Sequence, residues 1–557
     1  MMKPTKWIVV TGGVLSGLGK GVVSASIGRL LVPTYKVIPI KCDGYLNVDP
    51  GTMNPVEHGE VFVLDDGGEV DLDFGHYERF LNISCKSEWN LTSGKIFQSL
   101  VEKERRGDFL GKTVQVIPHV TGEIRARLKQ IARKEQADVV LVEIGGTVGD
   151  IENLWFLEAV RELSAEVEPE DILFVHLGLV PVLDEMGQQK TKPMQQSILF
   201  LRERGLIPQV IIGRSKERLT ERTKMKIHWL CNVPTQNVIS DPHLDYVYEL
   251  PVVFEEEGLR RVLAKQLNLK IPNRVEQWKR LVNRIKNPKK SITIAICGKY
   301  TELADSYISI EEALVHSAAH LNCKVNRKWV ETTDIERGKL TVQEALRGCQ
   351  GVIVAGGFGA RGAEGKISVI KYARENNIPF LGLCYGLQLA VVEFARNVCG
   401  LKGANSREIC TACRHHVIDY LPEQIGITNM GGTMRLGGHD VIVKKGTRAY
   451  SMYGNKTRKR FRHRNEVNPK YIKVLEKGGM IFSGKARGKP IMQIIELKDH
   501  PFFMASQFHP ELTSTLDKPS KMFYHFVETA LQLSEQALPK PQREEKPIPV
   551  AALSTVR

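Results

Sequence analysis

Long apolar runs are missing from this chain of 557 residues. No stretch of about 20 apolar residues occurs, so no segment predicts a membrane-spanning helix. Residues 1–6 lead into a strand-like run that is too short for the apolar core of a signal peptide. We therefore expect a cytoplasmic protein without a membrane partner. Hydrophobic residues make up 42% and charged residues 25%, which is ordinary for globular domains.

Cysteine is also scarce, with ten residues in the whole chain. That number excludes a disulfide-rich scaffold. The one close pair, Cys410 and Cys413, is followed by His415 and His416. A structural zinc site normally needs a second pair at suitable spacing, and none is present. We therefore expect free thiols in a loop at this position rather than a metal.

Positive charge is in excess, with a formal net charge of +15. This balance suits anionic partners, either nucleotides or nucleic acid. The densest basic run is residues 456–464. A run of charge is most often a solvated face, so it does not by itself indicate nucleic-acid binding.

Strand-like and helix-like stretches alternate along the chain, which favours an α/β fold with parallel sheets. Residues 1–270 predict a P-loop-like parallel-sheet domain, and residues 292–535 a second α/β domain. A charged, helix-like linker covers residues 271–291. Residues 536–557 are polar and proline-rich, and we expect them to be disordered.

A glycine-rich loop at residues 12–21, Gly-Gly-Val-Leu-Ser-Gly-Leu-Gly-Lys-Gly, separates a predicted strand from a predicted helix. Its backbone N–H groups and the helix N-terminus can bind phosphate, and Lys20 adds a full positive charge. Gly21 stands where the common phosphate-binding loop has the Ser or Thr that binds Mg²⁺, and the glycine spacing also differs. Either carboxylates elsewhere hold the Mg²⁺ of a nucleotide, or the loop is a turn without a ligand.

Cys384 lies between Gly382 and Gly386, after a strand-like run and before a helix-like one. This is the pattern of a nucleophile elbow, in which nearby backbone N–H groups form an oxyanion hole. His509 and Glu511 follow another strand-like run and can lie on one side of an extended segment. A lone buried cysteine is usually inert packing. The glycines and the nearby histidine and glutamate favour a catalytic set of nucleophile, base and orienting carboxylate.

These residues resemble the class I glutamine amidotransferase family. The resemblance implies that Cys384 attacks the glutamine amide, that His509 is the base and that Glu511 orients it. It implies an oxyanion donor at Gly357. The residues expected to bind glutamine are Gly357, Tyr385, Gly386, Leu387, Gln388, Glu408 and Arg464, of which Tyr385 stands where the family usually has Leu.

Further acids and lysines suggest an acceptor site in the first domain. Glu143 ends a predicted strand, where a Mg²⁺ ligand lies in this kind of fold, and Asp73 belongs to an acidic stretch. Any single acid is more often surface charge. Lys190 and Lys192 lie in a proline-containing loop and could hold a second triphosphate.

A longer series of stretches is distributed along the chain, at residues 12–21, 45–52, 58–63, 71–80, 103–108, 111–119, 145–152, 190–195, 404–406 and 431–437. Together they resemble the CTP synthase family, and the resemblance covers about residues 5–530. It implies that ATP phosphorylates UTP at the C4 oxygen and that ammonia from glutamine then displaces the phosphate. It also implies Mg²⁺ on Asp73 and Glu143, and an ammonia passage at His58 and Val61.

The same resemblance assigns the two nucleotides. ATP is expected at Gly17, Leu18, Gly19, Lys20, Gly21, Val22, Lys41, Asp73, Arg214, Pro242, His243 and Leu244. UTP, and product CTP as a feedback inhibitor, are expected at Ser16, Asp150, Ile151, Glu152, Lys190, Thr191, Lys192, Pro193, Met194, Gln195 and Lys226.

The family further implies a homotetramer and GTP as an allosteric activator. The basic run then places Arg464 at the glutamine carboxylate and leaves its other residues mostly on the surface, which argues against nucleic acid. Two alternatives are a partitioning- or septum-type P-loop ATPase and an amidotransferase acting on a cofactor acid. The Cys384 set argues against the first, and residues 145–152 and 190–195 argue against the second.

Overall fold

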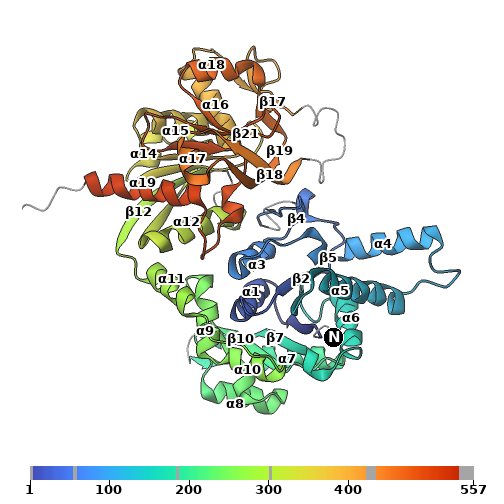
Figure 1. Cartoon of the computed structure of the whole chain (residues 1–557). Coiled ribbons are helices and arrows are strands. Elements are labelled where there is room, and N and C mark those ends of the chain that lie inside the picture. The colour runs from blue at the N-terminus through green and yellow to red at the C-terminus, as the bar shows by residue number, and fades with distance from the viewer. Residues whose placement is uncertain (1–3, 54–58, 184–186, 300–303, 422–433, 538–557) are drawn as a thin grey trace, which may run out of the picture.

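The computed structural model describes residues 4–53, 59–183, 187–299, 304–421 and 434–537. Figure 1 shows two α/β domains, coloured blue to green and yellow to red, with α11 (Glu276–Lys286) between them. No helix in the described ranges is long and apolar enough to cross a membrane. The predicted fold class, two α/β domains, is confirmed.

The first domain is built on a sheet of seven parallel strands with β1 near its centre. These strands read as near-continuous apolar runs because helices cover both faces of a parallel sheet. In order across the sheet they are β11 (Val238–Pro242), β10 (Val210–Ser215), β7 (Ile172–Leu179), β1 (Lys6–Gly12), β6 (Val139–Ile144), β2 (Val37–Asp43) and β5 (Asn90–Thr92).

Nine helices and two short hairpins complete the described part of this domain, and α1 packs against α3 and α9. The helices are α1 (Lys20–Leu31), α3 (Asp73–Leu81), α4 (Ser93–Arg106), α5 (Thr121–Glu135), α6 (Leu154–Ser164), α7 (Lys192–Glu203), α8 (Glu221–Cys231), α9 (Leu250–Glu256) and α10 (Leu259–Gln266). The hairpins are β3 (Phe62–Val63) with β4 (Glu69–Val70), and β8 (Val182–Leu183) with β9 (Gln188–Gln189).

The second domain contains a sheet of nine strands, parallel at one end and antiparallel at the other. In order they are β13 (Cys323–Glu331), β12 (Lys290–Gly298), β14 (Gly351–Val354), β15 (Phe380–Leu383), β23 (Phe503–Ser506), β22 (Met492–Glu496), β21 (Ile481–Ala486), β18 (Arg435–Val443) and β19 (Lys456–His463). A small sheet holds β16 (Asn405–Ser406), β17 (His416–Tyr420) and β20 (Asn465–Val467).

Helices flank this second sheet. They are α12 (Ile308–Leu321), α13 (Thr332–Glu336), α14 (Val342–Leu346), α15 (Ala363–Glu375), α16 (Tyr385–Asn397), α17 (Arg448–Tyr453), α18 (Ile472–Lys477) and α19 (Lys521–Ala537). The predicted tail begins at residue 536, but residues 536 and 537 still belong to α19, and its remainder lies outside the described residues.

The linker helix α11 is packed into the first domain rather than exposed on all sides. Trp278 is fully buried, and its indole N–H donates to the Tyr248 carbonyl oxygen at 2.7 Å. The Arg29 guanidinium lies 4.2 Å from the Trp278 ring centroid. The core of the first domain also includes Leu512 and Leu516 from the second. The two domains therefore share apolar contacts.

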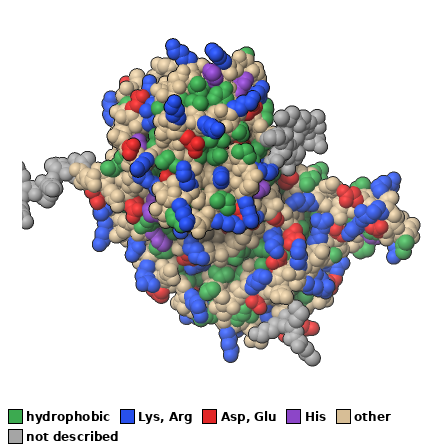
Figure 2. All heavy atoms as spheres, turned by 45° about the horizontal axis from the view of Figure 1, so that its top comes forward, with side chains coloured by type: hydrophobic (Ala, Val, Ile, Leu, Met, Phe, Trp, Pro, Cys, Tyr) green, Lys and Arg blue, Asp and Glu red, His purple; other side chains and the backbone are tan. Residues whose placement is uncertain are grey.

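Charge is distributed over the surface. Figure 2 shows Lys and Arg side chains spread over both domains on the face in view, with Asp and Glu side chains among them. The excess of +15 therefore forms no single basic patch on that face.

Candidate functional site

The glycine-rich loop joins β1 to α1, as predicted. Gly17 and Gly19 have φ angles of 74° and 95°, which glycine adopts without the strain that a Cβ would cause. α1 begins at Lys20, whose ammonium donates to the Gly146 carbonyl oxygen at 2.6 Å. Burial, together with the nearby charge of Lys41, lowers the pKa of Lys20. The glycine-rich loop and the stretch at residues 145–152 are therefore in contact.

The absence of a side chain at Gly21 has a steric explanation. A Cβ at this position would lie 1.9 Å from Oδ1 of Asp73. The space that a Ser or Thr side chain fills in the common loop is taken here by a carboxylate from α3. The glycine at position 21, which departs from the common motif, thus makes room for Asp73, the predicted acidic residue.

Asp73 and Glu143 meet at Lys41. The Lys41 ammonium binds Asp73, donates to Glu143 Oε1 at 2.8 Å and lies 3.8 Å from Asp43 Oδ1. Burial lowers the pKa of Lys41, but the carboxylates outweigh it and raise that pKa well above its ordinary value. Tyr77 donates to Glu143 Oε2 at 2.6 Å. No sequence pattern singled out Asp43 or Tyr77.

The donor chemistry of this cluster suits Mg²⁺, which prefers carboxylate oxygens. Across the described ranges, no group of three or more His, Cys, Asp or Glu side chains is arranged to hold a metal ion. At this cluster the Asp73 and Glu143 carboxylates share one cationic group, the Lys41 ammonium. Two oxygen ligands that already converge on a positive charge fit a divalent ion.

Helix α7, which includes four of the residues predicted for UTP, Lys192 to Gln195, lies against the glycine-rich loop. A Cβ at Gly13 would lie 2.1 Å from Cβ of Ser197, so α7 contacts the loop directly. His176, which the sequence did not single out, hydrogen-bonds Thr11 Oγ1 and Ser197 Oγ, each at 2.9 Å. Thr191 and Met194 are buried, Lys190, Pro193, Gln195 and Asp150 are half-buried, and Ser16, Ile151, Glu152, Lys192 and Lys226 are exposed.

The residues predicted for adenine lie where β10 and β11 end. Arg214 donates to Asp241 Oδ1 at 2.7 Å and to the Pro242 carbonyl oxygen at 3.3 Å. His243 is exposed and Leu244 is half-buried. Because the strands are parallel, their carboxyl ends lie at the same edge as the glycine-rich loop.

Cys384 sits in a strained turn between β15 and α16, with φ 51° and ψ −96°. Such a conformation costs about 1–3 kcal/mol in a residue other than glycine. A Cβ at Gly386 would lie 2.3 Å from the Val354 carbonyl oxygen, and one at Gly382 would lie 2.8 Å from Ala505 Cβ. The flanking glycines are therefore required by close packing.

His509 and Glu511 are brought to this turn. His509 Nδ1 is 2.7 Å from Glu511 Oε1. A Cβ at Gly356 would lie 3.4 Å from His509 Cε1 and 3.9 Å from Cys384 Cβ, so Gly356 borders both side chains. Burial lowers the pKa of His509, but its interactions with Glu511 and Cys384 outweigh burial and raise that pKa well above its ordinary value.

Four side chains hold residues 355–359, the glycine segment, which borders Cys384. The Lys366 ammonium donates to the Ala355 carbonyl oxygen at 3.1 Å, and the Lys299 ammonium to that of Phe358 at 2.5 Å. Tyr385 Oη donates to the Gly359 carbonyl oxygen at 2.6 Å, and the Gly359 N–H donates to Glu408 Oε1 at 2.8 Å. Burial lowers the pKa of Lys366 to about 8. No sequence pattern marked the two lysines.

The remaining residues predicted for glutamine surround the same turn. Gln388 Nε2 donates to the Asn465 carbonyl oxygen at 3.0 Å, and Asn465 Nδ2 donates to Glu408 Oε2 at 2.9 Å. Gly386 and Leu387 are buried in α16, and Arg464 is half-buried beside Asn465. Gly357 lies within the glycine segment.

Two expectations about basic and sulfur-containing residues are wrong. Arg460, expected on the surface, is 4% exposed and binds both Glu78 oxygens, because the basic run lies against the first domain. Cys410 and Cys413, expected as free thiols, form a disulfide with a Cα–Cα distance of 5.6 Å, since their loop brings them together.

The predicted ammonia passage is described only in part. Val61 is half-buried just before β3, while His58 lies outside the described residues. Next to Val61, the Glu60 carboxylate accepts a hydrogen bond from the Ser309 N–H at 3.2 Å, across the contact between the domains.

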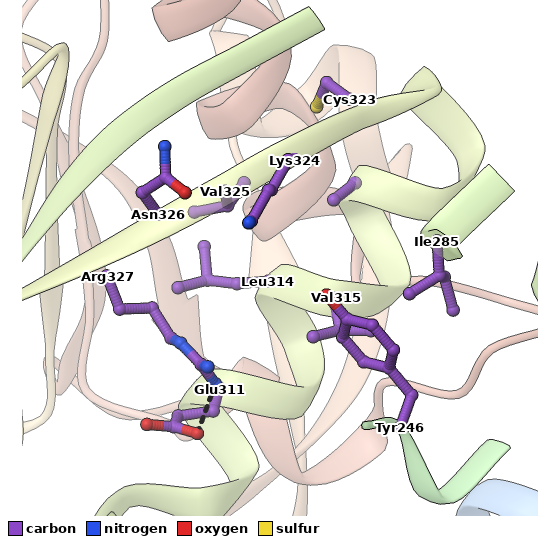
Figure 3. A pocket seen from close by; sticks show the side chains of 11 residues that line it. Tyr246, Ile285, Glu311, Leu314, Val315, Cys323, Lys324, Val325, Asn326 and Arg327 are labelled. Carbon is purple, nitrogen blue, oxygen red and sulfur yellow. Dashed lines mark hydrogen bonds and ion pairs between the residues drawn. The ribbon is translucent and has the colours of Figure 1, made fainter. Parts of the chain in front are cut away.

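A pocket of about 240 Å³ lies away from all of these residues (Figure 3). Leu314 and Val315 form part of an apolar floor, and Arg327 pairs with Glu311 beside it. No residue predicted for a substrate lines this pocket.

Comparisons with known proteins cover both domains. Residues 6–269 match the family model described as CTP synthase N-terminus, and residues 302–529 match the one described as glutamine amidotransferase class-I. The CTP synthase of Archaeoglobus fulgidus is 53% identical over 529 residues, covering 95% of this chain and 98% of that protein. The CTP synthase of Borreliella burgdorferi is 50% identical over 539 residues, covering 95% and 100%.

Among solved structures, the glutaminase domain of Trypanosoma brucei CTPS with bound acivicin is similar to the second domain. It is 33% identical, covers 43% of this chain and 94% of that chain, and has a TM-score of 0.40.

Proposed function

The chain belongs to the CTP synthase family, and we propose how its residues divide the family's reaction between two sites. The protein catalyses the glutamine-dependent amination of UTP. The observation that carries the proposal is that one chain holds a Cys384–His509–Glu511 set in one domain and a phosphate loop with a carboxylate–lysine cluster in the other.

In the second domain, Cys384 attacks the amide carbon of glutamine. The imidazolium of His509, stabilised by Glu511, supports the thiolate and gives its proton to the departing ammonia. The Gly357 and Tyr385 N–H groups stabilise the oxyanion, since fixed backbone donors favour the charge that develops there. Glu408, Arg464 and Gln388 fix the glutamine, together with Gly386 and Leu387 at the helix N-terminus.

In the first domain, ATP lies along residues 17–22, with its adenine between Arg214 and residues 242–244. Ser16 faces UTP on the α7 side, where Lys190–Gln195 and Lys226 hold the triphosphate and Asp150–Glu152 extend the site. Phosphorylation of the C4 oxygen makes a good leaving group, which ammonia then displaces. Lys20 and Lys41 offset the charge on the transferring phosphoryl group.

Asp73 and Glu143 are the residues that would hold Mg²⁺. The ion, when bound, supplies further positive charge for the phosphates. Lys41, which now shares these carboxylates, can then turn to the phosphoryl oxygens.

We further infer a homotetramer whose subunits meet through α7 and α8. Large apolar side chains are exposed there: Leu199, Phe200, Met225, Trp229 and Leu230. The exposed Ile151 and Glu152 suit an overlapping CTP site that reaches beyond the UTP triphosphate. Ammonia passage by Val61 and His58, activation by GTP and a cytoplasmic location stay predictions.

The two sites are tested by a pair of variants. Cys384→Ala should abolish CTP formation from glutamine and retain formation from ammonia, followed by the ultraviolet absorbance change as uracil becomes cytosine. Asp73→Asn should abolish both, while Cys384 still reacts with an electrophilic glutamine analogue. Equal loss of both nitrogen sources in Cys384→Ala would contradict the two-site proposal.

A further inference from the structure

The edge strand β19 touches the catalytic residues of one domain and the acidic residues of the other. We propose that Arg460 and Arg462 are positioning residues through which the first domain holds His509 and Cys384 in place. This rests on the proposed roles of Cys384 and His509. In Figure 1, β18 and β19 lie at the lower edge of the second domain, next to β4 and α3 of the first.

Arg462 contacts both sides at once. Its backbone carbonyl oxygen lies in contact with Cys384 Sγ, at 3.6 Å. Its guanidinium Nε donates to Glu69 Oε1 at 2.8 Å, and the Glu69 side chain is 2% exposed. A carboxylate of β4 therefore anchors the residue whose carbonyl group touches the nucleophile.

Arg460 likewise contacts both domains, with its carbonyl oxygen at His509, the proposed base, and its guanidinium at Glu78. Its carbonyl oxygen accepts the backbone N–H of His509 at 2.9 Å. Its guanidinium donates to both oxygens of Glu78, at 2.7 and 3.0 Å, with both side chains nearly fully buried. Glu78 lies on α3, the helix that begins at Asp73. One helix thus carries a proposed metal ligand and the anchor of Arg460.

The geometry of an extended strand explains the repeat. Residues two apart point their side chains to the same face and their carbonyl groups to the same edge. β19 is an edge strand, so the carbonyl groups turned away from β18 have no strand partner. The backbone N–H of His509 bonds to one of these carbonyl oxygens, that of Arg460, and Cys384 Sγ contacts another, that of Arg462.

Arg458 provides an internal control on the same strand. It lies two residues before Arg460 and donates to both oxygens of Asp65 at 3.0 Å, which is also a contact between the domains. This pair is more exposed, at 53% and 38% for the two side chains. Cys384 contacts the carbonyl oxygen of Arg462, and the His509 N–H bonds to that of Arg460. Neither contact involves Arg458.

The experiment compares Glu69→Gln with Asp65→Asn in the full chain. In Glu69→Gln, kcat for CTP formation from glutamine should fall roughly tenfold, because misplacing a reacting group by less than an ångström has effects of this size. KM for glutamine and the ammonia-dependent rate should stay within about twofold, as a positioning role acts through the chemical step. Alkylation of Cys384 should slow in parallel, and Asp65→Asn should leave all of these values near those of the unchanged protein.

Two results would overturn the proposal: equal behaviour of the two variants, or a parallel fall of the glutamine and ammonia rates. If Glu69→Gln does not fold, Arg462→Lys, which keeps the charge and shortens the reach, is judged by the same ratio of rates. Cys384→Ala separates this proposal from the proposed function. If that variant still used glutamine, the catalytic assignment itself would fail.

Discussion

At the scale of single residues, the position of Asp73 explains why Gly21 departs from the common phosphate-binding motif. The missing hydroxyl at this position made the glycine-rich loop ambiguous in the sequence. In the structure, Asp73 Oδ1 lies where the first side-chain atom would be. A carboxylate from another helix has replaced the local hydroxyl, so the Ser or Thr of the common motif cannot be accommodated without displacing it.

Gly21→Ser therefore restores the hydroxyl of the common motif at this position, yet it should inactivate the synthetase. The new Cβ would collide with Asp73, and inserting extra atoms into such a packed position typically costs about 1–3 kcal/mol. We expect both the glutamine- and ammonia-dependent rates of CTP formation to fall at least tenfold, while glutamine hydrolysis at Cys384 remains measurable. Gly107→Ala, at the end of α4, is the matched control, because a Cβ there would have open space and only the φ of 83° is unfavourable. Activity of Gly21→Ser near that of the control would refute the collision.

A second residue-scale prediction concerns pH. Burial lowers the pKa of His509, but Glu511 and Cys384 raise it well above the ordinary value, so the imidazolium persists through neutral pH. Glu511→Gln removes the larger of the two raising charges. The imidazolium should then lose its proton at lower pH, and the basic limb of the glutamine-dependent profile should move to lower pH. The ammonia-dependent profile should not move, and a shift to higher pH would contradict the assignment.

At the scale of elements, β18 and β19 form part of the contact between the domains. Gly437 on β18 has φ 80°, and a Cβ there would lie 2.5 Å from the backbone nitrogen of Gly67. The neighbouring Gly438 N–H donates to the Asp65 carbonyl oxygen at 2.8 Å. Strand β18 and the β3–β4 turn thus approach backbone to backbone, which only glycine permits.

Gly437→Ala should loosen this contact without unfolding either domain. We expect the glutamine-dependent rate to fall several-fold more than the ammonia-dependent rate, since strain and the collision both act at the interface. Gly446→Ala is the control, because Gly446 has a similar φ of 76° and open space around its Cβ position. Equal ratios of the two rates in both variants would show that the close approach has no role.

At the scale of the whole molecule, large apolar side chains of α7 and α8 stay exposed within the part of the chain that the structure describes. Trp229 is 70% exposed, and the predicted UTP residue Lys226 lies on the same helix. A large exposed apolar patch usually marks a contact between proteins. A second copy of the chain is the partner that the proposed tetramer supplies.

Trp229→Asp should shift the protein to a smaller species in size-exclusion chromatography, with and without nucleotides, because a charge would have to be buried in the contact. The apparent affinity for UTP should weaken with it. Val474→Asp, at a side chain that is 41% exposed on α18, is the control and should elute unchanged. An unchanged elution of Trp229→Asp would place any subunit contact elsewhere.

Much of the fold and site could be predicted from local pattern. The buried strands are continuous apolar runs, and the glycine-rich loop and the Cys384 elbow are each built from neighbouring residues whose spacing fixes the turn. The identities of Cys384, His509 and Glu511 also follow from short motifs, because the chemistry needs those residue types in those local settings. The specific pairing of Lys41 with Asp73 and Glu143 did not follow, since three separate elements supply it.

The sequence by itself determined the two α/β domains, the tight turn at Cys384 and the glycine-rich loop at residues 12–21, since each depends on residues close together in the chain. Only the tertiary structure decided why Gly21 is glycine, which lysines hold the segment at residues 355–359, and that Arg460 and Arg462 join the domains rather than face solvent. These contacts link residues up to several hundred positions apart. Their free energy depends on burial and distance, neither of which a linear pattern records.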